Sequence, residues 1–231
     1  MSKIQVISTF AEDRYFFKEN QVQKIKKGGP GFWITETLKD LAVPFAVTTG
    51  AKEAIVDITI EKNDEHGKIL LLPRISEKPP HDTDAFIIST IGDEFDLAKI
   101  ADLHGTIALD VQGYVRSSKI KGEETYQFPK TVEEHIDILK TNESELKYLN
   151  QQFIISQQNR IMLVTRGAEG FELYAAGVRT FLPSNPIAAP DTIGAGDVLL
   201  TAFLAAYLGT RDTLQSALFA RKYVEQFLMA K

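Results

Sequence analysis

The chain has 231 residues and a formal net charge of −5 at pH 7, and its length suits one globular domain with a large core. It contains no cysteine, which excludes disulfides, zinc–thiolate sites and cysteine nucleophiles. The negative charge argues against a general nucleic-acid or anionic-membrane partner, although a local basic pocket for phosphate is compatible with it.

Short apolar runs rich in β-branched residues alternate with longer helical patterns along the chain. The runs predict strands at residues 4–8, 45–49, 85–89, 106–110, 136–140 and 161–165. The helical patterns predict helices at residues 32–41, 94–103, 143–157, 198–208 and 213–229. This alternation predicts a single α/β domain over residues 1–231, with a mainly parallel central sheet covered by helices on both faces.

Two segments interrupt the alternation. Residues 14–27 alternate in polarity without a helical period. Residues 55–72 predict a hairpin, with a polar turn at residues 63–67 between two strands. From the residues alone, these strands either decorate the edge of the central sheet or form a small β lid.

Residues 191–197 read Asp-Thr-Ile-Gly-Ala-Gly-Asp and lead directly into an apolar helical stretch. A glycine-rich loop before a buried helix presents unpaired backbone N–H groups to an anion. Beside that anion, Asp197 would be repelled unless it has chemistry to perform, and accepting a proton from an attacking hydroxyl is such chemistry. The alternative is an ordinary first-turn Asp that interacts with the helix dipole.

This heptad resembles the C-terminal signature of the ribokinase (PfkB) family of sugar and nucleoside kinases, Asp-Thr-x-Gly-Ala-Gly-Asp. The resemblance implies that Asp197 is the catalytic base and that the loop binds the transferring phosphoryl group. The implied anion hole consists of the amides of Gly194, Ala195 and Gly196, and Thr192 is an implied nucleotide contact. It also implies a ribokinase-like fold, with lid strands within residues 14–27 and 55–72.

In two further motifs, the resemblance implies that named residues contact the nucleotide or its metal ion. Asn142 and Glu145 form a capping-box pattern at a helix start, and they also resemble the family's Asn-x-x-Glu motif. The resemblance implies that this pair places Mg²⁺, usually through water, beside the phosphates. Thr165 and Gly167 resemble the Thr-x-Gly segment that lines the ATP site, whereas Gly170 suits a tight turn.

The implied acceptor site lies in the first half of the chain. Asp13 resembles the early family Asp that binds substrate hydroxyls, and Gly28 and Gly29 resemble the Gly-Gly loop that hydroxyls approach. Arg116 ends a stretch from Asp110 that resembles inositol-kinase-like members, and it is an implied substrate contact. Many members have an Asn shortly after the Gly-Gly loop, where this chain has Trp33; this departure puts a ribose- or fructose-like acceptor in question.

The sequence contains no motif of several other common kinds of site. There is no Walker-type Gly-x-x-x-x-Gly-Lys-Ser/Thr sequence, which argues against a P-loop mechanism. The histidines have no metal-ligand spacing; they are His66, His81, His104 and His135. The N-terminus lacks a secretory signal pattern and no apolar run is long enough to span a bilayer, so we expect a cytoplasmic protein.

The motifs follow the family's order over nearly the whole chain. The resemblance therefore implies a short ribokinase-family kinase of an inositol-kinase-like or nucleoside-kinase-like subgroup, with ATP and Mg²⁺ as cofactors. It implies transfer of the γ-phosphoryl group to a hydroxyl of a sugar or polyol, and a homodimer through the lid strands. A nucleoside kinase and a non-catalytic nucleotide- or sugar-binding relative remain alternatives. The sequence names neither the acceptor, the preferred donor nor the oligomeric state.

Overall fold

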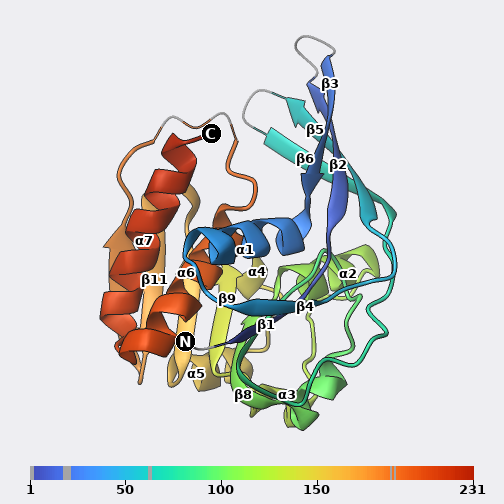
Figure 1. Cartoon of the computed structure of the whole chain (residues 1–231). Coiled ribbons are helices and arrows are strands. Elements are labelled where there is room, and N and C mark those ends of the chain that lie inside the picture. The colour runs from blue at the N-terminus through green and yellow to red at the C-terminus, as the bar shows by residue number, and fades with distance from the viewer. Residues whose placement is uncertain (1–2, 18–21, 62–63, 188, 190) are drawn as a thin grey trace.

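The computed structural model describes residues 3–17, 22–61, 64–187, 189 and 191–231. Its larger sheet has eight strands in the order β12-β11-β10-β9-β8-β7-β1-β4 (Figure 1). These strands are β1 (Ile4–Ser8), β4 (Phe45–Thr48), β7 (Asp82–Ser89), β8 (His104–Asp110), β9 (Ile138–Asn142), β10 (Ile161–Thr165), β11 (Gly170–Ala175) and β12 (Val178–Pro183). Strands β4, β1 and β7 to β10 pair in parallel, and β11 and β12 add an antiparallel edge.

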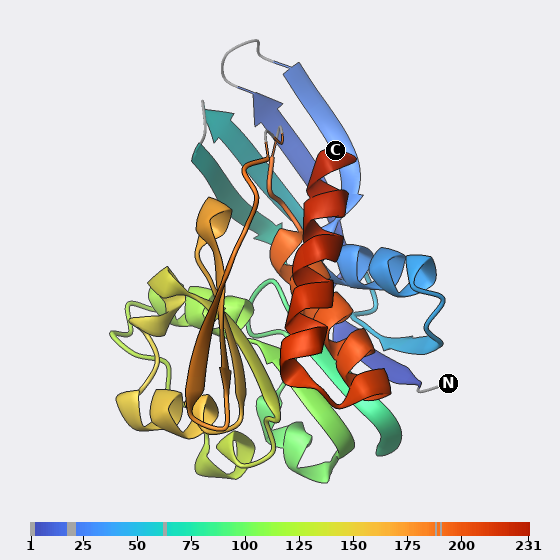
Figure 2. The ribbon, with the colours of Figure 1, turned by 90° about the vertical axis from the view of Figure 1, so that its left-hand side faces the viewer.

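Helices cover both faces of this sheet, as predicted (Figure 2). One face packs against α1 (Gly29–Asp40), α6 (Ala195–Thr210) and α7 (Thr213–Met229). The other packs against the 3₁₀ helix η1 (Leu97–Asp102), α2 (Gln112–Ile120), α3 (Lys130–Glu133) and α5 (Gln151–Gln158). Each face buries its own hydrophobic cluster, which gives the three-layer α/β architecture expected for parallel strands. Within the described ranges, no helix combines the length and apolarity needed to cross a membrane.

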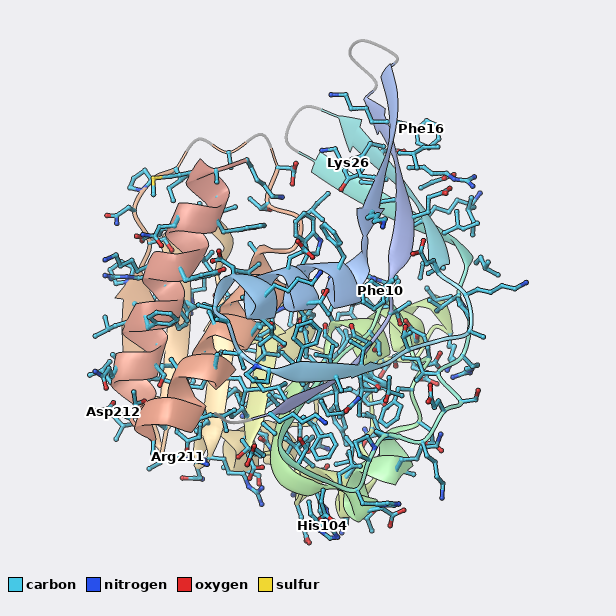
Figure 3. All side chains as sticks on the ribbon, viewed as in Figure 1. Phe10, Phe16, Lys26, His104, Arg211 and Asp212 are labelled. Carbon is cyan, nitrogen blue, oxygen red and sulfur yellow. The ribbon has the colours of Figure 1, made fainter. Side chains whose placement is uncertain are left out.

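A second, smaller sheet projects from one end of the molecule (Figures 1 and 2). It has the order β3-β2-β5-β6, from β2 (Ala11–Phe17), β3 (Val22–Gly28), β5 (Ala54–Glu61) and β6 (Asp64–Leu71). Figure 3 places Phe16 and Lys26 on this sheet and Phe10 near its base beside α1. The two interrupting segments therefore form a separate lid sheet and do not decorate the central one. The predicted turn at residues 63–67 is wrong in position, because β6 already begins at Asp64; Asn63 lies outside the described residues.

The predicted helix at residues 94–103 is wrong at its start. Glu94 does not enter a helix, because its carboxylate accepts hydrogen bonds from the backbone N–H groups of Ile91 at 2.8 Å and Gly92 at 2.5 Å. The same carboxylate accepts a hydrogen bond from the hydroxyl of Thr9 at 2.6 Å. Together these hydrogen bonds fix the conformation of the loop that follows β7. Only residues after Asp96, whose side chain caps η1, are helical, and they form a 3₁₀ helix.

The predicted helix at residues 143–157 is also wrong, because it divides into α4 (Glu143–Leu146) and α5. Leu149 leaves the helix to form a bridge with Tyr126, and the side chain of Asn150 then caps a new helix. The predicted strand at 136–140 lies two residues further along, as β9. Helix α2 was not predicted from the sequence, whereas β1, β10 and α7 have the predicted bounds.

Candidate active site

A cavity of about 710 Å³ lies between the lid sheet and the carboxyl ends of the parallel strands. This is where α/β folds commonly bind ligands, because the loops after the strands converge there. Most of the predicted site residues lie on its wall: Asp13, Gly29, Arg116, Asn142, Thr165, Gly167, Thr192, Gly194, Ala195, Gly196 and Asp197. Gly28 and Glu145 lie behind the wall and do not line the cavity.

Asp197 lies in the first turn of α6 and faces the cavity. Its Oδ1 atom accepts a hydrogen bond of 2.8 Å from the hydroxyl of Ser89, the last residue of β7. Desolvation by the surrounding protein, and then the negative charge of Asp110, raise the pKa of Asp197 to about 7. The charges of Lys140 and Arg116 and the Ser89 hydrogen bond oppose this rise. A carboxylate that gains a proton near pH 7 is suited to general-base work.

The loop at residues 191–197, called the signature loop below, presents backbone donors to the cavity. Gly194 is the N-cap of α6 and adopts a left-handed conformation with φ of 84°. The N–H of Ala195 donates to the carbonyl of Thr192 at 3.1 Å, which closes a turn. Among the described residues, the N–H groups of Gly194 and Gly196 have no hydrogen-bond partner. Two of the three amides implied as the anion hole are therefore available to a ligand, and the third is already engaged.

Trp33 supports the signature loop and lies on the cavity wall. A Cβ atom added to Gly194 would lie 2.5 Å from carbon atoms of the indole, so the ring packs against the loop backbone. The Nζ of Lys231 lies 5.0 Å from the centre of that ring, donates to the carbonyl of Ile193 at 2.7 Å and pairs with the carboxylate of Asp191. These contacts were not predicted from the sequence, because Trp33 lies about 160 positions from the signature loop and 198 from Lys231.

A buried ion pair lies at the base of the site. The Nζ of Lys140 on β9 lies 2.9 Å from the Oδ2 of Asp110, the last residue of β8. Burial alone would lower the pKa of Lys140, but the carboxylates of Asp110, Glu145 and Asp197 raise it above its ordinary value. No role was predicted for Lys140 from the sequence, where it is the last residue of the predicted strand at 136–140.

Asn142 and Glu145 form the capping box of α4. The side chain of Asn142 accepts the backbone N–H of Glu145 at 2.9 Å, and Glu145 Oε2 accepts the N–H of Asn142 at 2.9 Å. Asn142 also lines the cavity, so it can face a metal ion there while it caps α4. The described residues hold no cluster of three or more His, Cys, Asp or Glu side chains for a metal. The pair therefore fits Mg²⁺ held mainly by phosphate and water, and does not fit a cage of protein ligands.

Asp13 lies at the lid end of the cavity, on β2. Desolvation by burial raises its pKa to about 6, and a hydrogen bond from the backbone N–H of Gly29 partly opposes the rise. A Cβ atom added to Gly28 would lie 1.7 Å from an oxygen of Asp13. Gly28 thus leaves the space that the Asp13 carboxylate occupies on the cavity wall.

If Asp13 binds the acceptor hydroxyls, as the resemblance implies, Gly28→Ala should raise the KM for the acceptor by about tenfold or more, because the new methyl group displaces the Asp13 carboxylate. The affinity for the nucleotide, measured by calorimetry, is expected to change little. Gly209→Ala is the matched control, since an added Cβ there meets nothing within 4 Å. An unchanged acceptor KM in Gly28→Ala would contradict the assignment of Asp13 to the acceptor.

The remaining predicted residues lie along the cavity wall. The hydroxyl of Thr165, at the end of β10, lies 3.4 Å from the carbonyl of Thr141. Gly167 has a φ of 55° and open space around its Cα, so it leaves room for a ligand. Arg116 on α2 donates to the carbonyl of Ile91 at 2.7 Å, and its positive charge opposes the rise in the pKa of Asp197.

Comparisons with known proteins agree with this geometry. A family model described as pfkB family carbohydrate kinase matches residues 94–223, more than half of the chain. An uncharacterized sugar kinase of Pyrococcus horikoshii, PH1459, is 32% identical over 119 residues. That match covers 49% of this chain and 37% of the relative, so it spans little more than a third of the relative's length.

Solved structures resemble the whole chain at low sequence identity. One is a pyrophosphate-dependent kinase in the ribokinase family, complexed with a pyrophosphate analog and myo-inositol. Its TM-score is 0.76 at 15% identity, covering 97% of this chain and 94% of that one. Arabidopsis thaliana ribokinase, complexed with ribose and ATP, has a TM-score of 0.74 at 16% identity, covering 100% and 93%. The fold is therefore ribokinase-like.

The family match includes the signature loop, the Asn142–Glu145 cap and the Asp110–Lys140 pair, which the fold brings together on the wall of one cavity or directly behind it. This chain belongs to the pfkB family of carbohydrate kinases.

Proposed function

We propose that the protein is a Mg·ATP-dependent kinase that transfers the γ-phosphoryl group of ATP to a hydroxyl of a sugar or polyol. The observation that carries the proposal is the position of Asp197, a carboxylate of raised pKa beside the unpartnered amides of Gly194 and Gly196. Family membership supports the same reaction class. Asp13 at the lid end supports an acceptor that presents hydroxyl groups.

In the proposed reaction, Asp197 accepts the proton of the acceptor hydroxyl as the hydroxyl oxygen bonds to the γ-phosphorus. The bond from that phosphorus to the β–γ bridging oxygen breaks, and ADP leaves with the bond electrons. The amides of Gly194 and Gly196 stabilise negative charge on the transferring group. Thr165, Gly167 and Thr192 would bind the donor and Asp13, Gly29 and Arg116 the acceptor, and all six residues line the cavity.

Asn142, with Glu145 acting through water, would hold Mg²⁺ against the phosphates. When bound, the ion neutralises phosphate charge and orients the γ-phosphoryl group.

The decisive experiment is a screen of sugars, inositols and nucleosides with Mg·ATP, with product identified by phosphorus NMR. Pyrophosphate serves as a second donor, because one structural neighbour is a pyrophosphate-dependent kinase. Transfer from ATP to a sugar or polyol supports the proposal. Transfer only to nucleosides, only from pyrophosphate, or to no acceptor would contradict it.

The rate of transfer is expected to rise with pH, because the reaction needs the deprotonated carboxylate of Asp197. With a pKa of about 7, kcat/KM should increase about tenfold per pH unit well below pH 7 and level off above it. The charged groups that face this carboxylate are Asp110, Lys140 and Arg116. Initial rates in buffers of constant ionic strength measure the profile, and a constant rate from about pH 5.5 to 8 would contradict Asp197 as the base.

We also propose that the lid strands form a homodimer. Strands β3 and β6 are the edges of the lid sheet, and Ile25 and Leu70 on them are 67% and 46% exposed. Open sheet edges with exposed apolar side chains favour pairing. Light scattering after size-exclusion chromatography tests this, with Ile25→Lys expected to give a monomer.

A further inference from the structure

The ammonium group of Lys140 lies against the backbone of the signature loop. Lys140 is 4% exposed, and it contributes to the cavity wall. A Cβ atom added to Gly196 would lie 2.7 Å from the Nζ of Lys140 and 3.1 Å from its Cε. The ammonium therefore touches the backbone of the loop at the place where the unpartnered amides face the cavity.

Asp110 holds this ammonium from one side. Asp110 Oδ2 accepts its 2.9 Å hydrogen bond, while Oδ1 accepts the backbone N–H of Gln112 at 3.0 Å. An ammonium has three N–H donors, and among the described residues no second acceptor of Lys140 is found. The other N–H groups of the Lys140 ammonium can therefore donate hydrogen bonds to a ligand in the cavity.

A purely structural ion pair explains this arrangement poorly. Removing an ion pair from water costs several kcal/mol per ion, and apolar residues of similar volume are often as stable. Lys140 lines the cavity together with Asp197, and Asp110 lies directly behind it, paired with Lys140 and close enough for its charge to act on Asp197. A fixed cation beside unpartnered amides is the arrangement that stabilises developing negative charge.

We propose that Lys140 is a further catalytic residue, whose ammonium donates a hydrogen bond to a non-bridging oxygen of the transferring phosphoryl group. This inference rests on the proposed function. Lys140 keeps its proton throughout, so the proton of the acceptor still goes to Asp197 and no other bond is made or broken. Asp110 is a positioning residue that directs the ammonium toward the Gly196 backbone.

The first test is Lys140→Met, which removes the charge and keeps much of the side-chain volume. We expect kcat to fall by about 10²- to 10³-fold, with the acceptor KM changed by less than about threefold. Lys121→Met is the matched control, because Lys121 is also ion-paired, with Asp93 at 2.8 Å, but lies away from the cavity. A kcat of Lys140→Met within about threefold of wild type would overturn the inference.

Chemical rescue separates charge from packing. Lys140→Cys introduces the only thiol of the chain, so 2-bromoethylamine can restore an ammonium at this one position. Recovery of at least about tenfold in kcat supports the catalytic role. No recovery, with the modification confirmed by mass spectrometry, contradicts it.

Lys140→Met leaves the carboxylate of Asp110 buried without its partner, and this variant can fail to fold. The double variant Asp110→Asn/Lys140→Met removes both charges and keeps the test available, with the same loss of kcat expected. A folded double variant with a kcat near wild type would overturn the inference.

A binding measurement distinguishes this inference from the proposed function. Titration calorimetry of Mg·ATP and Mg·ADP needs no acceptor. In Lys140→Met we expect about tenfold weaker binding of Mg·ATP and less than about threefold weaker binding of Mg·ADP, because only ATP carries the γ-phosphoryl group. Equal weakening of both contradicts the role of Lys140. An inactive wild-type protein in the acceptor screen contradicts the proposed function alone.

Discussion

Replacing Asp197 by Asn is expected to lower kcat by on the order of 10²- to 10⁴-fold, because the amide cannot accept the proton of the acceptor hydroxyl. Asn has nearly the same shape and can still accept the hydrogen bond from Ser89. Mg·ATP should therefore bind with an affinity close to wild type, as measured by calorimetry. Turnover near the wild-type rate would contradict the assignment of Asp197 as the base.

The same substitution is expected to stabilise the fold at pH 8. The pKa of Asp197 rises from an ordinary 3.8 to about 7 in the folded protein, which therefore binds the proton more tightly than the unfolded chain. Stability is lost as the pH rises from about 4 through 7, and Asn avoids this loss. Thermal unfolding should show a higher Tm than wild type at pH 8 and a similar Tm at pH 4. A lower Tm at pH 8 would contradict desolvation as the main cause of the shift.

Gly194→Ala is the second substitution with a large expected effect. An added Cβ would lie 2.5 Å from the indole of Trp33, and φ at this position is 84°. Because the clash with the indole and the left-handed φ both strain the backbone at this position, we expect the loop to move and the Gly194 and Gly196 amides to lose their place at the cavity. Loss of one such donor lowers kcat by about 10²- to 10³-fold, and we expect at least this effect.

Gly122→Ala is the control for backbone strain. Gly122 has a similar φ of 75°, but an added Cβ there meets no atom within 4 Å. It should cost about 1–2 kcal/mol of unfolding free energy, the ordinary cost of a left-handed conformation, and leave kcat unchanged. If Gly194→Ala behaves like Gly122→Ala in steady-state kinetics and denaturant unfolding, the contact with Trp33 does not position the loop.

Much of the fold could be predicted because its local patterns are strong. The parallel strands are short β-branched runs, and α7 has an uninterrupted helical pattern between the Asp212 cap and its end, so its bounds agree residue by residue. The prediction was wrong where a side chain takes backbone groups out of a helix. Glu94 binds the loop before η1, and Asn150 starts a new helix after Leu149 has paired with Tyr126.

The candidate site was predictable where a motif is contiguous. Residues 191–197 and the Asn142–Glu145 pair are short contiguous motifs whose roles the family resemblance implies, and both lie at the cavity or directly behind its wall. Ser89 had no such signal, because its contact with Asp197 joins residues 108 positions apart. Lys140 showed only as a polar residue at the end of a predicted strand.

The sequence by itself determined the α/β class, the helix start that presents backbone donors, and a carboxylate placed beside them. These features depend on residues that are neighbours in the chain. Only the tertiary structure decided the surroundings of that carboxylate: Ser89 as its hydrogen-bond donor, the Asp110–Lys140 pair beneath it, and the indole of Trp33 against Gly194. The physical reason is that desolvation and charge act through space, so the raised pKa of Asp197 depends on groups that folding brings together from four separate strands and helices.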